Sequence, residues 1–301
     1  MSQQPKYRFY ATLLDAFTEF LDVKVEEFFY QDEQGKWHIN YNENTGELHF
    51  SEEEVYQLAK QQLIDKINRV HKEPSEAAEK GTALNEIIDC MIMKQPCKRD
   101  DMIIKTLKEI EVKKETGSIS LADGKPDAYD YWFEKIKTPC IYAHSQGFDF
   151  YFDINFCRQV ADYFKGSICQ MPISVDIQTN YGIVELYGYP DYIKENKVYD
   201  LKTTKQYKFG KYEKSWQKHV YPYALIKTGK CTEIKEFEYS CYRLMGGTPT
   251  QPLIKGMFFP EVYLFDYHTS EYLLKEQCER FIEFIENNKN VITDKKLLCQ
   301  N

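Results

Sequence analysis

The sequence lacks the features that place a protein in a membrane, in a secretory route or around a structural zinc ion. None of its nine cysteines forms a C-x-x-C pair, which argues against a zinc ribbon and a dithiol redox site. No window approaches the roughly 18 to 20 uninterrupted apolar residues that cross a bilayer. The first residues carry no basic stretch followed by an apolar run. We therefore expect a soluble intracellular protein whose cysteines, such as Cys157 and Cys278, are small buried thiols.

The chain has fewer basic than acidic residues: 39 lysines and arginines against 47 aspartates and glutamates, which gives a net charge of −8. This balance argues against nonspecific binding of nucleic acid over the whole surface, but it is compatible with a local basic groove. Hydrophobic residues make up 43% of the chain and aromatic residues 15%, enough for a sizeable core. Because no repeat, low-complexity tract or obvious linker interrupts the sequence, we expect one domain over 1–301, with a helical and hairpin portion at 1–75 and a core at 76–301.

Residue periodicity predicts an α/β protein with a mixed sheet and an N-terminal helical portion. Ser51 followed by Glu54 is a capping-box pattern that starts one of the helices. Helices are predicted where apolar residues recur at helical spacing, over 7–30 (Leu13, Phe17, Leu21), 51–70, 81–93 (Leu84, Ile88, Met91), 154–164, 207–228 and a last segment with Leu274, Cys278, Phe281, Ile282 and Ile285 on one side. Strands are predicted by alternation and turn residues over 170–178, 183–189, 197–203, 236–244 and 257–267, with a hairpin at 31–46. The segment 95–150 holds charge runs, a turn at 124–127 and short aromatic segments that are compatible with strands.

One short stretch combines two acids and a lysine, as Gly188-Tyr189-Pro190-Asp191 followed by Val198-Tyr199-Asp200-Leu201-Lys202. The Asp-x-Lys pattern alone carries no weight, because it recurs at 22–24, 123–125 and 294–296. In this copy, however, Asp191 ends a predicted hairpin strand, and Asp200 and Lys202 lie on the next strand. Period-two alternation puts Asp200 and Lys202 on one face of that strand. The other copies lack this arrangement.

These residue types suit the hydrolysis of a phosphodiester bond. Hard carboxylate oxygens such as those of Asp191 and Asp200 bind Mg²⁺ or Mn²⁺, which neutralises phosphate charge and makes a bound water nucleophilic. Lys202 would orient or activate that water and stabilise the developing negative charge. The alternative is that Asp200 and Lys202 form an ordinary ion pair on a solvated strand, an interaction that is common and weak.

The stretch resembles the core of the PD-(D/E)XK nuclease superfamily, and within it the RecB-like and phage exonuclease branch. The resemblance implies a restriction-endonuclease-like core, in which helices flank a mixed central sheet. It also implies that the Leu201 carbonyl joins Asp191 and Asp200 as a metal ligand. Asp191, Asp200 and Lys202 would then be the catalytic residues.

A further part of the resemblance lies on the predicted helix that follows. Gln217 and Tyr221 are four residues apart and share a helix face, as does the Gln-x-x-x-Tyr element of RecB-like nucleases, which contacts substrate and steadies the site. The alternative is an incidental polar pair. Pro222 departs from the pattern, because proline removes a helical hydrogen-bond donor and is expected to kink or end the helix beside Tyr221.

Upstream, Gly81-Thr82-Ala83-Leu84-Asn85-Glu86 is similar to the Gly-x-x-x-His-Glu element that opens the core in this branch. Asn85 stands where histidine is usual, and its amide oxygen favours Mg²⁺ over softer metals. Glu86 faces away from the apolar stripe of its helix and would reach the metal. The alternative for Glu86 is a solvated helix face.

The segment 202–218 is rich in lysine and contains only one acidic residue, Glu213. We expect Lys205, Lys208, Lys211 and Lys214, together with Gln217 and Tyr221, to contact the phosphates of DNA, although a lysine-rich helix face is usually only solvated. The aromatic residues between them would stack on unpaired bases or, alternatively, belong to the core; they are Tyr207, Phe209, Tyr212 and Trp216.

The resemblance implies a Mg²⁺- or Mn²⁺-dependent deoxyribonuclease, in particular an exonuclease of phage-type recombination or repair in the cytoplasm of a bacterium or an infected host. It also implies DNA as partner, and further a single-strand annealing protein and a homo-oligomer. Several relatives hold an iron–sulphur cluster with closely spaced C-terminal cysteines, but only Cys278 and Cys299 lie near this end, so we expect no cluster. The alternatives are an endonuclease of the same fold, a catalytically inactive module that only binds nucleic acid, and an interaction domain in which the motif is accidental.

Overall fold

The computed structural model describes residues 4–32, 36–42, 45–115 and 131–299, which form a mixed α/β structure. The helices within these ranges are α1 (Ala11–Leu21), α2 (Glu52–Ile67), α3 (Glu76–Met93), α4 (Ile154–Tyr163), α5 (Gln217–Lys227) and α6 (Tyr267–Asn287). No helix among the described residues is long and apolar enough to cross a membrane.

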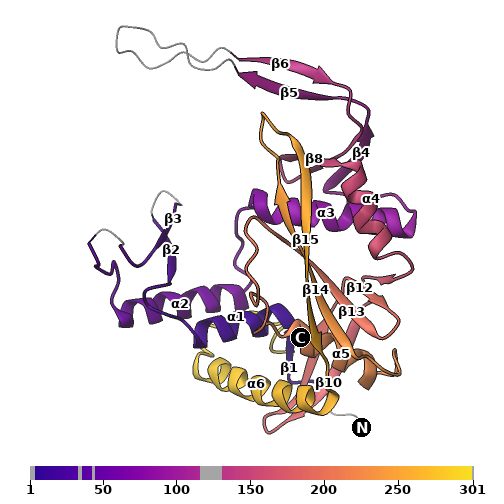
Figure 1. Cartoon of the computed structure of the whole chain (residues 1–301). Coiled ribbons are helices and arrows are strands. Elements are labelled where there is room, and N and C mark those ends of the chain that lie inside the picture. Colours follow the sequence, from indigo (N-terminus) through magenta and orange to yellow (C-terminus); the bar gives the residue numbers. More distant parts are fainter. Residues whose placement is uncertain (1–3, 33–35, 43–44, 116–130, 300–301) are drawn as a thin grey trace.

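The strands form one large mixed sheet and three smaller sheets. The large sheet has the order β4 (Met102–Leu107), β7 (Cys140–Ser145), β8 (Phe148–Asp153), β15 (Leu253–Leu264), β14 (Glu236–Met245), β13 (Lys197–Thr204), β12 (Tyr192–Lys194) and β9 (Ile168–Cys169). A second sheet has the order β1 (Tyr7–Tyr10), β11 (Gly182–Gly188) and β10 (Ile173–Thr179). The two hairpins are β2 (Phe29–Gln31) with β3 (Trp37–Ile39), and β5 (Ile110–Glu115) with β6 (Tyr131–Ile136), the latter projecting from the top of the molecule in Figure 1.

The large sheet lies between two hydrophobic cores. On one face, α1, α2, α5 and α6 pack with apolar side chains of the sheet that include Val198, Phe237 and Tyr239. On the other face, α3 and α4 pack with side chains that include Tyr192 and Leu201. Val198 and Leu201 belong to the same strand, so alternation along β13 sends neighbouring side chains into different cores. In Figure 1, α3 and α4 lie beside the upper part of the large sheet, whereas α1, α2 and α6 lie near its lower end.

The centre of the fold is a parallel pair of strands joined by a helix. β13 pairs in parallel with β14, with Asp200 opposite Tyr239 and Lys202 opposite Cys241, and α5 makes the connection between them. On its other edge β13 pairs antiparallel with the short β12, where Tyr192 lies opposite Tyr199. Because β12 is so short, the second half of β13 has a free edge on that side.

Several sequence predictions are confirmed. The capping box is present, with Ser51 N donating to Glu54 Oε2 at 2.9 Å and Glu54 N donating to Ser51 Oγ at 3.4 Å. α4 lies where a helix was expected, and the predicted apolar stripe of α6 is buried from Leu274 to Ile285. The expected inner face of β10, with Ile173, Val175 and Ile177, is buried. The mixed α/β class follows, and strands also occupy most of the described part of 95–150; the turn expected at 124–127 lies outside the described residues.

Two predicted helices are too long. The helix expected over 7–30 begins only at Ala11, because residues 7–10 form β1, which pairs in parallel with β11; Leu21 of the expected stripe is 40% exposed. The helix expected over 207–228 begins at Gln217, and the segment before it consists of turns. In both cases long-range contacts, invisible to local periodicity, decide the conformation. The strands predicted over 170–178, 183–189 and 197–203 divide between two sheets, with β10 and β11 in one and β13 in the other.

Candidate active site

Asp200 and Lys202 form an ion pair on β13 in which the acid is buried and the lysine side chain is 23% exposed. Asp200 is only 3% exposed, and its Oδ2 lies 2.6 Å from the Lys202 Nζ. Both side chains lie on the α5 face of the strand, as alternation predicts, while Leu201 packs in the core of α3 and α4. This burial does not fit an ordinary ion pair on a solvated strand, since removing two charges from water is costly without close compensation.

Lys202 is held in its protonated form. Burial acts to lower the pKa of Lys202, but the charge and hydrogen bond of Asp200 outweigh burial and leave the pKa above its ordinary value. The Nζ also donates to Gln217 Oε1 at 2.8 Å and lies 5.8 Å from the ring centres of both Tyr212 and Tyr239. A lysine that keeps its proton is suited to stabilise negative charge rather than to accept a proton.

Asp191 lies between β11 and β12, beside the free edge of β13. Its Oδ2 accepts a hydrogen bond from the Leu201 N–H at 2.8 Å, and its Oδ1 accepts one from Gln170 Nε2 at 3.1 Å. Burial, and after it the charge of Asp200, raises the pKa of Asp191 far above its ordinary value. In an extended strand the N–H and C=O of one residue point the same way, so the Leu201 carbonyl also points toward the Asp191 side. Two carboxylates and a carbonyl therefore lie together at this edge.

Gln217 is hydrogen-bonded to Asp200, Lys202 and Tyr221. Its Nε2 donates to Asp200 Oδ1 at 2.7 Å and to the Tyr221 hydroxyl at 3.2 Å, while its Oε1 accepts from Lys202. Gln217 is 5% exposed and Tyr221 is 6% exposed, so this network is shielded from water. The Tyr221 ring packs against Gly188, where an added Cβ would lie 2.9 Å from the ring.

Pro222 was expected to kink the helix or to end it, and the helix does not end there. Proline removes one helical hydrogen bond and crowds the carbonyl four residues earlier, yet α5 continues to Lys227 with Pro222 inside it. Tyr221 consequently keeps its helical spacing from Gln217 and its hydrogen bond to that side chain.

α3 packs closely against β13 at Gly81, the one glycine of this helix. A Cβ at Gly81 would lie 2.6 Å from Thr203 Oγ1, so the helix and strand touch at this point. Asn85, one turn later on the same helix face, has a buried Oδ1 without a hydrogen-bond partner in the described structure. Glu86 is the next residue of the helix; its Oε1 accepts a weak hydrogen bond from Cys90 Sγ at 3.9 Å, and its charge acts on Asp89.

A second acid of α3, Asp89, shares two neighbouring side chains with Asp191, and the sequence analysis missed it. Asp89 is 5% exposed, and burial raises its pKa to about 6. Gln170 and Tyr192 lie between Asp89 and Asp191, and the charges of both acids act on the Tyr192 hydroxyl. The signal in the sequence is that Asp89 is the only charged residue of the apolar run 87–93.

A second missed residue, Asp15 of α1, fixes the start of α5. Its Oδ1 accepts from the backbone N–H of Trp216 at 2.6 Å, and its Oδ2 accepts from Ser215 Oγ at 3.1 Å. Trp216 is the N-cap residue of α5 and has no side-chain cap of its own, so a carboxylate from α1 takes that role. Burial raises the pKa of Asp15, while the charge of Lys202 acts in the opposite direction.

The lysines expected to contact DNA do not share one helix face, because 205–216 forms turns. Lys214 is paired with Asp22 at 2.6 Å, whereas Lys211 lies 5.5 Å from the centre of the Tyr212 ring. Lys205 and Lys208 are exposed. Three of the aromatic residues of the segment contact the rest of the fold: Tyr207 stacks on Phe259, Tyr212 stacks on Tyr239, and the Trp216 indole donates to Thr18 Oγ1. The fourth, Phe209, is 80% exposed.

The donor set at β13 suits a hard divalent cation. Within the described residues, no three side chains of His, Cys, Asp or Glu come together as a ligand group. The oxygens that do gather here belong to Asp191, Asp200 and the Leu201 carbonyl, and Asn85 offers a buried oxygen without a partner. Carboxylate, carbonyl and amide oxygens are the ligands that Mg²⁺ and Mn²⁺ prefer.

Comparison of the chain with models of protein families, with curated proteins and with solved structures found no match.

Proposed function

We propose that this protein is a metal-dependent DNA nuclease with a PD-(D/E)XK-type site at Asp191, Asp200 and Lys202. The observation that carries the proposal is a buried carboxylate, Asp200, paired with the partly buried Lys202 and close enough to the partly buried carboxylate of Asp191 to raise its pKa. One lysine neutralises one carboxylate. Burial and the charge of Asp200 raise the pKa of the second, Asp191, so a second negative charge is disfavoured here unless a divalent cation compensates it.

Each residue has a defined part in this proposal. Asp191, Asp200 and the Leu201 carbonyl, with Asn85 as a further oxygen donor, would hold Mg²⁺ or Mn²⁺, which when bound supplies charge neutralisation and an activated water. Lys202 stays protonated and stabilises the negative charge that builds on the phosphoryl oxygens. Gln217 holds Asp200 and Lys202 in place through one side chain, and Tyr221 fixes Gln217.

The arrangement of elements supports the same proposal. Helices cover both faces of a mixed central sheet, and the three proposed catalytic residues come from two adjacent segments of that sheet. The finer assignment, an exonuclease of phage-type recombination or repair acting in the cytoplasm with an annealing protein and as a homo-oligomer, is supported by the sequence resemblance alone.

The experiment compares degradation of end-labelled linear DNA and closed circular DNA with Mg²⁺, with Mn²⁺ and with EDTA. The variants are Lys202→Ala and, as a matched control, Lys235→Ala, whose side chain is 63% exposed and is paired with Glu233. We expect metal-dependent loss of linear DNA, lowered at least about 100-fold by Lys202→Ala because an electrostatic stabiliser is removed. Lys235→Ala should behave as wild type.

The other outcomes decide among the alternatives. Cutting of circles would retain the chemistry and overturn the exonuclease assignment. Equal DNA binding with and without metal, and no cleavage, would replace the proposal with a catalytically inactive binding module. Equal activity of Lys202→Ala and wild type would contradict the assignment of the catalytic site to β13.

A further inference from the structure

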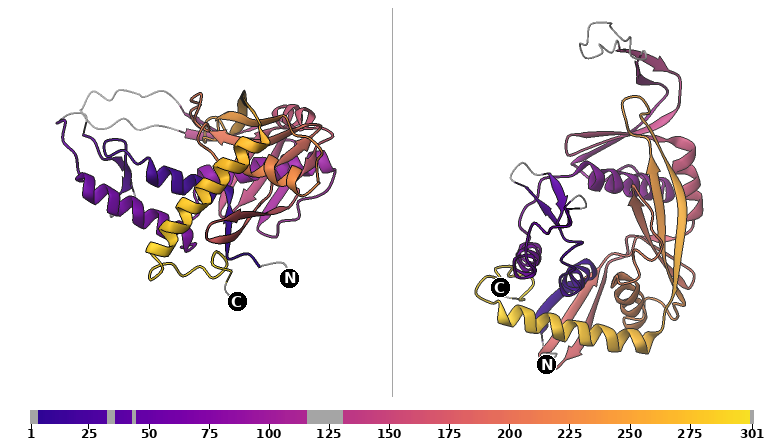
Figure 2. Two further views of the ribbon diagram at one scale, coloured as in Figure 1. Left: turned by 90° about the horizontal axis from the view of Figure 1, so that it is seen from below. Right: turned by 60° about the vertical axis from the view of Figure 1, so that its left-hand side comes forward.

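A groove of about 830 Å³ opens between the N-terminal portion and the candidate active site. Residues of α1, α2 and the β2–β3 hairpin line the groove together with residues 210–215, and Lys202 and Gln217 also line it. Figure 2 shows α1, α2 and the β2–β3 hairpin standing to one side of the long strands β14 and β15. The N-terminal portion therefore forms part of the approach to the proposed catalytic residues.

The β2–β3 hairpin turns its apolar face outward. Phe29 is 57% exposed and Trp37 is 59% exposed, and both line the groove. The register places Phe29 opposite Ile39 and Gln31 opposite Trp37, so Phe29 and Trp37 lie diagonally on the same face of the ribbon. The inner face holds Tyr30, whose ring packs 4.8 Å from that of Phe50. An outward pair of large aromatic rings beside a catalytic groove indicates a ligand with flat apolar faces.

The charges of the groove are nearly balanced, since six lysines face five acids. Lys24 is paired with Glu27 and Lys214 with Asp22. In the described part of the chain no acid lies within ion-pair distance of Lys66, Lys72 or Lys211, and Lys202 is committed to Asp200. These three lysines are enough for a few phosphates, so the rest of the affinity must come from the aromatic rings.

We propose that the groove binds a single-stranded DNA end, with Trp37 and Phe29 stacking on unpaired bases while a phosphate reaches Lys202. This inference rests on the proposed nuclease function and names its substrate class. Bases inside a duplex expose only their edges in the grooves, so their faces are closed to an aromatic side chain. Unpaired bases offer those faces, and stacking on them is tolerant of sequence.

The test measures binding, without cleavage, by fluorescence anisotropy in EDTA. The probes are a labelled single strand of about ten nucleotides, in the range of single-strand site sizes, and a blunt duplex of the same length. We expect the single strand to bind more tightly than the duplex. Trp37→Ala and Phe29→Ala should each weaken single-strand binding by roughly 5-fold to 150-fold, the equivalent of losing one stacked base. Trp37→Phe should recover most of the loss.

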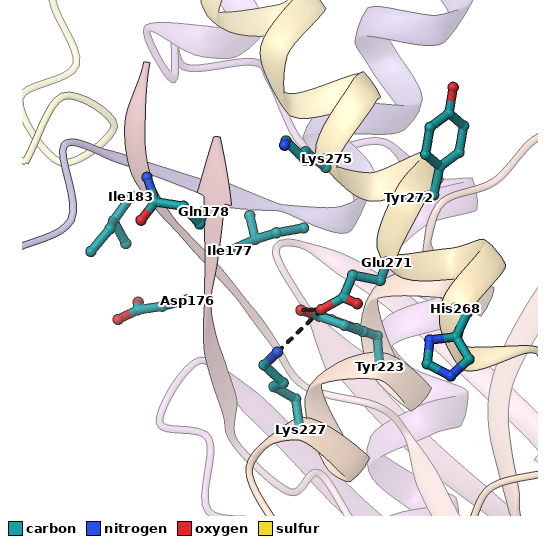
Figure 3. Close-up of a pocket in the computed structure, with 10 residues that line it drawn as sticks. All are labelled: Asp176, Ile177, Gln178, Ile183, Tyr223, Lys227, His268, Glu271, Tyr272 and Lys275. Carbon is teal, nitrogen blue, oxygen red and sulfur yellow. Dashed lines mark hydrogen bonds and ion pairs between the residues drawn. The ribbon is translucent and has the colours of Figure 1, made fainter. Parts of the chain in front are cut away.

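Tyr272→Ala is the matched control. Tyr272 is another exposed aromatic residue, at 66%, but it lines a separate pocket of about 490 Å³ with Tyr223, His268 and Glu271, far along the chain from the hairpin (Figure 3). This variant should bind as wild type. The salt dependence gives a second measurement: three phosphate contacts predict a slope of log K against log salt no steeper than about −2.

Three results would overturn the inference: unchanged single-strand binding in both Trp37→Ala and Phe29→Ala, equal affinity for the blunt duplex, or a much steeper salt slope. Because binding is measured in EDTA, the outcome is separate from the proposed chemistry. If these variants lose binding and the protein does not cleave DNA with any of the metals, the groove would be supported as a single-strand binding site. The proposed nuclease function would be contradicted.

Discussion

Gln217 is the residue at which the candidate site is assembled. Its amide group satisfies Asp200 on one side and Lys202 on the other, and its own position depends on the start of α5. That start is capped by Asp15, which comes from a helix about 200 positions away in the sequence. A single carboxylate in α1 therefore positions the side chain that arranges the proposed catalytic residues.

This arrangement predicts a split between two substitutions at Asp15. Asp15→Ala removes the cap and should lower kcat by about tenfold, since small displacements of catalytic groups are costly, with a smaller change in KM. It should also lower the free energy of unfolding by about 1 kcal/mol, as expected for a lost N-cap. Asp15→Asn keeps an acceptor for the Trp216 N–H and should recover most of kcat. Steady-state kinetics and urea unfolding measure both effects, and an Asn variant as impaired as the Ala variant would show that charge rather than capping matters.

At the scale of elements, α3 packs against β13 beside the site without room for a side chain at Gly81. The helix approaches the strand where Gly81 meets Thr203, and this approach brings Asn85 and Asp89 to the β13 side of the fold. Any side chain at Gly81 must displace the helix or the strand. The contact thus determines how far the proposed oxygen ligands of α3 lie from those of the sheet.

A double-mutant cycle tests this contact. Gly81→Ala brings a methyl group into conflict with Thr203 Oγ1 and should lower the free energy of unfolding by roughly 1 to 2 kcal/mol, despite the better helix propensity of alanine. Thr203→Ala removes the conflicting oxygen, so Gly81→Ala in that background should be neutral or stabilising. Urea unfolding of the four proteins gives the coupling energy. Equal effects of Gly81→Ala in both backgrounds would contradict the assigned contact.

The same contrast between local and distant contacts explains what the sequence could predict. The capping box of α2 and the apolar stripe of α6 are local patterns, and both are present in the structure. The alternation along β13 correctly placed Asp200 and Lys202 together. β1 and the turns before α5 depend on pairing and packing with remote segments, so periodicity misassigned them. Asp15 and Asp89 were missed for the same reason, because their partners lie on other elements.

At the scale of the whole molecule, the N-terminal portion and the proposed catalytic core share one hydrophobic core. Leu13, Leu14 and Phe17 of α1 lie in the same hydrophobic core as Val220 of α5 and Phe281 of α6. The same portion supplies Asp15 to the site and one wall of the groove. The described residues up to 75 thus share a core with the rest of the described chain, and the approach to the site depends on both.

The most direct measurement is a calorimetric titration of Mg²⁺ and Mn²⁺ into the wild type, into Asp200→Asn and into the control Asp162→Asn, whose acid lies exposed on α4. It depends on neither the substrate nor its polarity. The prediction is saturable binding by the wild type and by Asp162→Asn, with affinity lowered at least about tenfold in Asp200→Asn because a hard-cation ligand has lost its charge. Equal binding by all three proteins, or none by the wild type, would contradict a metal site at Asp191 and Asp200.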